Sequence, residues 1–144
     1  MTAPFIMLVD DEVSFLETMA KRLATRNINI ITAFSAEEGL EKLKTNQNLD
    51  VIVLDVKMPG MGGIAALKEI KKISPLIEVI MLTGHATMES AIDGMKLGAY
   101  DFLTKPCDIE EIVSKVEEAT KNKRAHDEKI AAAKSKKILQ EYEP

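Results

Sequence analysis

Five polar residues stand where short apolar segments of this chain end. Asp10 and Asp11 follow the first apolar run, Asp55 and Thr83 end two later runs, and Lys105 lies just past a fifth. Three carboxylates, a hydroxyl and an ammonium are the groups that a divalent cation and a phosphoryl group would need for binding. Their chemistry requires that the fold bring these separate positions to one place.

The elements that must position these residues are predicted by alternation of apolar runs with longer amphipathic segments. This pattern is typical of strand–helix units around a parallel sheet. The predicted strands are Phe5–Val9, Asn29–Ala33, Val51–Asp55, Val79–Thr83 and Tyr100–Leu103. The first, third and fourth are nearly all apolar, as in strands covered by helices on both faces, whereas the second is mixed and predicts an edge. Five units with right-handed crossovers predict an α/β fold with a doubly wound parallel sheet.

Helix signals lie between the predicted strands. Ser35 with Glu38 forms a capping box that predicts a helix start. A helix predicted over 88–97 ends before Gly98, a residue that readily adopts the left-handed conformation. Asp108 is predicted to cap the fifth helix.

The composition divides the 144 residues into two parts. Residues 1–122 have the length and patterning of one domain with its own core. Residues 123–144 are rich in lysine and poor in apolar side chains, which predicts a polar, helical tail or a linker.

Charge and hydropathy exclude several classes of function. The net charge of −4 gives no electrostatic argument for direct nucleic-acid binding. No stretch approaches the roughly 18 apolar residues of a membrane span. The single cysteine, Cys107, suits a reducing compartment. We therefore expect a cytoplasmic protein with no membrane contact.

The carboxyl ends of parallel strands meet at one edge of a sheet, where ligands of doubly wound folds bind. Asp10, Asp11 and Asp55 are therefore expected to lie together. Two unit charges about 4 Å apart repel by about 4 kcal/mol at an effective dielectric near 20. A hard cation with oxygen ligands removes that cost, so we expect Mg²⁺ (or Mn²⁺) at the three carboxylates, with Lys105 supplying further positive charge.

Four segments at these strand ends carry a family pattern. They are Val9–Glu12, Leu54–Gly63, Met81–Gly84 and Phe102–Pro106. In this order they resemble the receiver domain of bacterial two-component response regulators, and the resemblance covers about residues 4–122. It implies five parallel strands in the flavodoxin-like order 2-1-3-4-5.

The resemblance also implies roles for the residues of the cluster. Asp55 would accept a phosphoryl group from the phosphohistidine of a sensor histidine kinase or of a histidine phosphotransfer protein. Asp11 and Asp55 would hold Mg²⁺ through their side chains and Lys57 through its backbone carbonyl, while Asp10 would act through metal-bound water. The same resemblance implies that the chain is a switch and no enzyme, catalysing only its own phosphorylation and dephosphorylation.

Residues nearby would bind and sense the phosphoryl group. Thr83 and Lys105 would contact its oxygens, and Gly84 would leave space for the donor. The Lys105–Pro106 bond is usually cis in this family. Phe102 would turn inward after phosphorylation. Many family members have tyrosine there, and phenylalanine keeps the bulk but has no hydroxyl.

Two cationic residues are candidates for setting the lifetime of the phosphoryl group. Lys57 stands two residues beyond Asp55, and His85 stands two residues beyond Thr83. Both could pair with the phosphoryl group and alter the attack of water, or both could be loop residues that point to solvent.

The output is expected at the face formed by the fourth helix, fifth strand and fifth helix, acting on a downstream protein or through a homodimer. One reading is a stand-alone regulator. The alternative is a truncated N-terminal receiver of a larger transcriptional regulator.

Two other classes share parts of the pattern. A phosphatase of the haloacid dehalogenase type also uses an Asp nucleophile with Mg²⁺, but it expects a second Asp where this chain has Lys57. A flavodoxin-like carrier would need a phosphate cradle after the first strand, where Asp10 and Asp11 would repel a flavin phosphate.

Overall fold

The computed structural model describes residues 2–84 and 88–141, without the side chain of Met88. Strands and helices alternate along these residues. The strands are β1 (Phe5–Val9), β2 (Asn29–Ala33), β3 (Val51–Leu54), β4 (Glu78–Thr83) and β5 (Asp101–Thr104). The helices are α1 (Val13–Ala24), α2 (Ala36–Thr45), α3 (Gly63–Ile73), α4 (Met88–Lys96) and α5 (Ile109–Glu141).

The predicted boundaries are confirmed for β1 and β2 and differ by one residue elsewhere. β3 ends at Leu54 rather than at Asp55, and α4 ends one residue earlier than predicted. β4 begins at Glu78 because the Glu78 N–H already bonds to the carbonyl of Asp50, at 3.2 Å. β5 is shifted by one residue, to Asp101–Thr104. Such end effects follow from backbone pairing, which side-chain hydropathy does not report.

The sheet is parallel throughout, with strand order β2-β1-β3-β4-β5. The predicted order and the edge position of β2 are thereby confirmed. Val9 pairs with Ala33 on one side and with Leu54 on the other, and Thr83 pairs with Thr104. The last residues of the strands therefore lie side by side along one edge.

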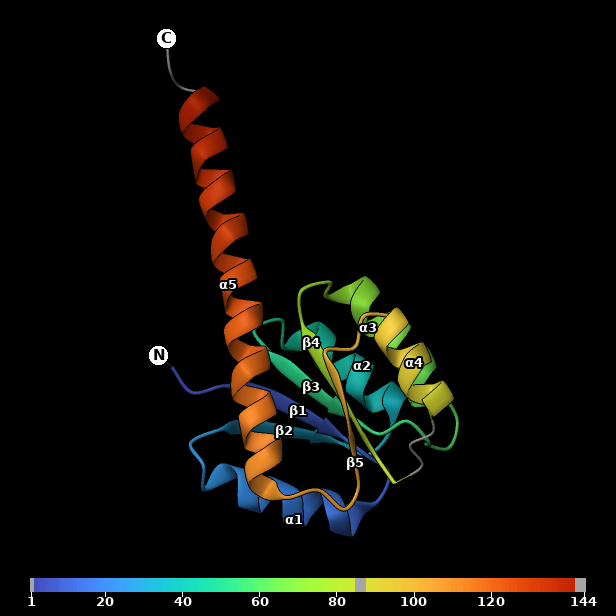
Figure 1. Cartoon of the computed structure of the whole chain (residues 1–144). Helices are drawn as coiled ribbons and strands as arrows, with labels where there is room; N and C mark the ends of the chain where they lie inside the picture. Colours follow the sequence, from blue (N-terminus) through green and yellow to red (C-terminus); the bar gives the residue numbers. More distant parts are fainter. Residues whose placement is uncertain (1, 85–87, 142–144) are drawn as a thin grey trace.

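Alternate residues of the sheet feed two separate core layers. Ile6 and Leu8 pack into the layer with α1 and α5, whereas Met7 and Val9 pack into the layer with α2 and α3. Figure 1 shows α1 and α5 on one side of the sheet and α2, α3 and α4 on the other. Covering both faces explains why the central strands are almost entirely apolar.

Local signals act where the sequence places them. The Glu38 N–H donates to Ser35 Oγ at 3.1 Å, and the Glu38 carboxylate accepts from the Phe34 N–H, so the predicted cap of α2 forms. Gly98, just beyond α4, has a φ of +99°, the left-handed conformation for which glycine is suited.

The fifth helix continues well past the body of the domain. α5 ends at Glu141, and its residues from 128 onward are all exposed. Figure 1 shows this part of α5 projecting away from the sheet. The predicted helical C-terminal extension is confirmed, while the division at residue 122 into domain and tail stays a prediction. Within the described residues, no helix is long and apolar enough to span a membrane.

A buried ion pair anchors the start of this extension. Asp50 is buried, and its Oδ1 and Oδ2 accept from Arg124 Nε at 3.1 Å and Nη2 at 2.9 Å. The Arg124 guanidinium also donates to the carbonyls of Thr2 and Ala3, and the Phe5 N–H donates to Asp50. A residue of the predicted tail therefore ties α5 to the first strand and to the loop before β3.

We predict that Asp50→Asn lowers the free energy of unfolding by about 2–3 kcal/mol, because it leaves a half-buried guanidinium without its carboxylate. Urea unfolding measures the change. The matched control is Arg26→Gln, which breaks an ion pair with Glu110 whose side chains are 38% and 62% exposed. That variant should lose less than about 1 kcal/mol. Equal losses in the two variants would contradict the anchoring role of Asp50.

Candidate functional site

Backbone hydrogen bonds set the positions of the candidate residues at the carboxyl edge of the sheet. The Asp55 N–H donates to the carbonyl of Val9 at 3.0 Å, which brings Asp55 next to Asp10. The Lys105 N–H donates to the carbonyl of Thr83 at 2.9 Å. These bonds continue the strand pairing by one step, so the five predicted residues gather because their strands are in register.

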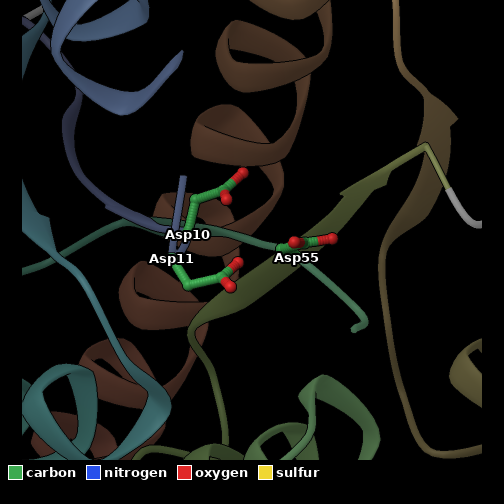
Figure 2. A group of neighbouring side chains, drawn as sticks. All are labelled: Asp10, Asp11 and Asp55. Atoms are coloured by element: carbon green, nitrogen blue, oxygen red, sulfur yellow. The ribbon is translucent and has the colours of Figure 1, made fainter. Parts of the chain in front are cut away.

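The three carboxylates form one cluster. One oxygen of each of Asp10, Asp11 and Asp55 lies within 4.8 Å of the others. Asp10 and Asp55 are each only 3% exposed, whereas Asp11 is exposed. Figure 2 shows Asp10 and Asp11 next to each other, with both side chains extending to the side on which Asp55 lies. The predicted convergence of carboxylates is therefore present in the fold.

One ammonium partly balances this cluster. Lys105 Nζ lies 2.6 Å from Asp10 Oδ2 and 4.0 Å from Asp55 Oδ2. The carboxylate of Glu12, which is outside the cluster, lies 3.2 Å from the same Nζ. Burial alone would lower the pKa of Lys105, but the hydrogen bond and the charge of Asp10, together with the charge of Asp55, outweigh burial and raise it. Lys105 therefore stays protonated.

The carboxylate of Asp10 is fixed by a hydrogen bond, but its charged form is disfavoured by its surroundings. Its Oδ1 accepts from the Glu12 N–H at 2.9 Å, which fixes its carboxylate at the start of α1. Burial raises the pKa of Asp10 above its ordinary value, and the charge of Asp55 adds to the rise against the lowering effect of Lys105. The Lys105 ammonium thus does not fully offset the cost of burying the ionised carboxylate of Asp10.

The cluster fits a hard divalent cation. Asp55 Oδ1 is buried and has no hydrogen-bond partner within the part of the chain that the structure describes. Such an oxygen is costly unless a ligand satisfies it. An open pocket next to it is lined by Asp11, Glu12, Asp55, Lys57, Met58 and Pro59. The site thus combines oxygen donors and access, as Mg²⁺ binding requires.

The loop between β3 and α3 is fixed from two sides. Glu37, in α2, accepts a hydrogen bond from the Met61 N–H at 2.9 Å. Gly63 packs so closely that a Cβ there would overlap the backbone carbonyl of Asp55. The exposed Lys57 lies in this loop, beside the acidic cluster. Its predicted backbone ligand role stays a prediction.

The remaining predicted residues lie at different distances from the cluster. A Cβ built on Gly84 would meet Lys105 Cβ at 3.8 Å, an ordinary contact. Phe102, in β5, is partly buried against the core layer of α2 and α3. The Lys105–Pro106 peptide bond is cis, as expected. His85 lies outside the described residues.

Four residues around the site carried no predicted role in the sequence. Glu12 and Phe15 contact Lys105, whereas Glu37 and Gly63 position the β3–α3 loop. Glu12 has a weak signal, since it continues the acidic run after Asp11. The other contacts depend on how α1, α2 and α3 lie on the sheet, which no local pattern reports.

Comparison with known proteins gives one consistent family. The family model described as response regulator receiver domain matches residues 6–117. The DNA-binding transcriptional regulator NtrC of Escherichia coli (strain K12) is 38% identical over 114 residues, which are 79% of this chain and 24% of that protein. The transcriptional regulatory protein ZraR of the same organism is 34% identical over 127 residues, 88% of this chain and 29% of that protein. The chain thus spans about a quarter of the length of these curated relatives.

Solved structures agree with this result. A response regulator receiver domain protein from Clostridium thermocellum aligns with a TM-score of 0.81 and 36% identity, over 85% of this chain and 98% of that chain. The receiver domain of NtrX from Brucella abortus aligns with a TM-score of 0.75 and 33% identity, over 81% of this chain and 98% of that chain.

We predict that Mg²⁺ stabilises the fold at neutral pH, by about 1.4 kcal/mol at about ten times its dissociation constant. A carboxyl with a raised pKa makes the metal-free fold less stable as the pH rises through that pKa, and the cation opposes this loss. The stabilisation should therefore become smaller as the pH is lowered from neutral toward the raised pKa of Asp10, because protons then compete with the cation. Urea unfolding with and without Mg²⁺ measures it.

The matched variants are Asp11→Asn, in the cluster, and Asp108→Asn, an exposed residue outside it. Only the first should reduce the Mg²⁺ effect. A Mg²⁺ response that survives in Asp11→Asn at full size would place the cation elsewhere.

Proposed function

This chain belongs to the response regulator receiver domain family, and on that premise we propose that Asp55 accepts a phosphoryl group from a phosphohistidine. The observation that carries the proposal is the buried Asp55 Oδ1, which has no hydrogen-bond partner among the described residues and stands in the acidic cluster. The donor would be a sensor histidine kinase or a histidine phosphotransfer protein.

In the proposed step, an Asp55 carboxylate oxygen forms a bond to phosphorus. The phosphorus–nitrogen bond of the donor breaks, and its electron pair returns to the imidazole nitrogen. Asp55 becomes an acyl phosphate, and hydrolysis of that group later restores the carboxylate. Phosphoryl transfer of this kind asks a protein mainly for positioning and for stabilisation of negative charge.

Asp10, Asp11 and Asp55 supply oxygen ligands of the type that Mg²⁺ prefers, and Mn²⁺ has the same preference. We assign Asp11, Asp55 and the Lys57 backbone carbonyl as direct ligands, with Asp10 acting through water. When bound, the cation supplies positive charge that offsets the charge of the transferring phosphoryl oxygens.

Lys105 and Thr83 complete the proposed phosphoryl site. The Lys105 ammonium is 4.0 Å from Asp55 Oδ2, within reach of a group attached there. Thr83, at the end of β4, is bonded through its backbone carbonyl to the Lys105 N–H, so the two side chains start from neighbouring points. Gly84 follows directly and is proposed to leave room for the donor.

We propose that the α4–β5–α5 face carries the output. Movement of Thr83 toward the phosphoryl group would let Phe102 turn inward and change this face. Ile92 and Met95 of α4 are each 48% exposed, which supports contact with a partner. The partner is a downstream protein, a second copy, or an output domain.

The last of these readings is favoured by one observation. The chain spans about a quarter of the length of relatives named as transcriptional regulators, which supports a receiver that is part of such a regulator. A stand-alone cytoplasmic regulator is the second candidate.

The protein is proposed to be a switch and no turnover enzyme. A phosphatase of the dehalogenase type needs an acid two residues after its nucleophile to protonate the leaving group. Lys57 occupies that position and lines the same pocket as Asp55. The chain would therefore catalyse only its own phosphorylation and dephosphorylation.

We predict that Asp55→Asn abolishes phosphoryl uptake from acetyl phosphate or a phosphohistidine donor in the presence of Mg²⁺, because the amide cannot form the acyl phosphate. Intact-protein mass spectrometry follows the gain of one phosphoryl group. Asp108→Asn, an exposed carboxylate outside the cluster, serves as control and should keep full uptake. Uptake by Asp55→Asn at the wild-type level would remove Asp55 from its proposed role.

Lys57→Ala and His85→Ala should change the lifetime of the phosphoryl group, because a cation near it alters the approach of water. A change on the order of twofold to tenfold in hydrolysis rate is expected if either side chain pairs with the phosphoryl oxygens. Loss of label over time measures it, with Lys68→Ala, an exposed α3 residue, as control. Unchanged rates in both variants would contradict a role of Lys57 and His85 in setting the lifetime.

A further inference from the structure

Among the described residues, the Lys105 ammonium lies close to three carboxylates and to one uncharged group. Asp10, Glu12 and Asp55 lie at 2.6, 3.2 and 4.0 Å from Nζ. The fourth is the ring of Phe15, whose centroid is 4.1 Å from Nζ. This distance is well inside the range in which the negative face of an aromatic ring attracts a cation. The Lys105 side chain is 12% exposed, so water screens the attraction little.

The ring is fixed relative to the acidic cluster. Phe15 is in the first turn of α1, three residues after Glu12, and it packs against the core layer of α1 and α5. Together with Asp10, Asp55 and Leu82 it lines a small pocket beneath the site. Since α1 begins directly after the metal-ligand candidates, the position of the ring is set by the same backbone that places them.

The ring differs from the carboxylates in what else it can bind. Asp10 and Asp55 have a second use in the proposed reaction. Asp10 would hold metal-bound water, and Asp55 would be a metal ligand and then the acceptor, whose carboxylate becomes an acyl phosphate. The ring of Phe15 is neither a metal ligand nor a reacting group in the proposed step. Glu12 also keeps its charge, but its side chain is 61% exposed, so water screens it. The attraction of the ring for the ammonium therefore persists while Asp10 and Asp55 change.

We propose that Phe15 is a positioning residue for Lys105: its ring face keeps the ammonium beside Asp55 while Asp10 and Asp55 engage the cation and the phosphoryl group. This inference rests on the proposed function of Lys105 as a phosphoryl-binding residue. A residue with a packing role alone would be replaceable by any apolar side chain of similar size. The aromatic face is what the positioning role requires.

Phe15→Leu and Phe15→Tyr separate packing from aromaticity. Leucine keeps apolar bulk without a ring, whereas tyrosine keeps the ring. Phe15→Met, an unbranched apolar side chain, is made in parallel in case leucine impairs folding. Phe5→Leu removes a partly buried ring from β1, in the other core layer, and serves as control.

The first readout needs neither metal nor phosphoryl donor. The ring current of Phe15 should shift the NMR signals of the Lys105 ε-methylene protons upfield, and Lys105→Met assigns those signals by removing them. The shift should vanish in Phe15→Leu and Phe15→Met and remain in Phe15→Tyr and Phe5→Leu. A wild-type signal at the unshifted position would overturn the contact, and with it the proposal.

The second readout is the rate of phosphoryl uptake from acetyl phosphate with Mg²⁺. Phe15→Leu and Phe15→Met should slow uptake by about twofold to fivefold, with wild-type rates in Phe15→Tyr and Phe5→Leu. If the wild-type protein takes up the phosphoryl group and Phe15→Leu and Phe15→Met do so at the same rate, the positioning role alone is overturned. No uptake by the wild-type protein would overturn the proposed function, and the positioning role with it.

Discussion

The constraint on which the site depends is negative charge gathered at one edge of the sheet. Parallel pairing of β1 with β3 brings Asp10 and Asp55 together, and Asp11 joins them, with oxygens within 4.8 Å of one another. Among the described residues, the ion pairs to these carboxylates come from one ammonium, that of Lys105. The pKa of Asp10, raised by burial and by Asp55, reports the imbalance. Carboxylates that repel one another in the absence of a cation are suited to binding a cation and to responding to a phosphoryl group.

The opposite edge of the sheet shows how the same fold treats buried carboxylates that have only a structural use. Both oxygens of Asp50 are bonded to Arg124, and Glu78 accepts from Asn122 at 2.8 Å. Both partners come from α5. The buried carboxylates at this edge thus have partners from within the chain. At the other edge, Asp55 Oδ1 has no hydrogen-bond partner among the described residues. The contrast separates a structural use of buried acids from a functional one.

Much of this could be predicted from the sequence, because the information is local. Strand hydropathy placed Asp10 and Asp55 at strand ends, and parallel topology then required them to meet. Contacts made by helix packing could not be predicted: Phe15 meets Lys105 across 90 positions, and Arg124 meets Asp50 across 74. The composition change near residue 122 predicted a boundary, yet α5 runs through that position without a break. Alanine and lysine, which are common in this segment, are good helix formers even where the helix is exposed to solvent.

The most direct test of the central claim is to locate the acceptor chemically. After incubation with a phosphohistidine donor and Mg²⁺, borohydride reduction converts an acyl phosphate of aspartate into homoserine, which peptide mass spectrometry can place in the sequence. We expect a single homoserine, at position 55. Homoserine at Asp10 or Asp11 instead, or a stable phosphoryl group on a serine, threonine or histidine, would contradict it.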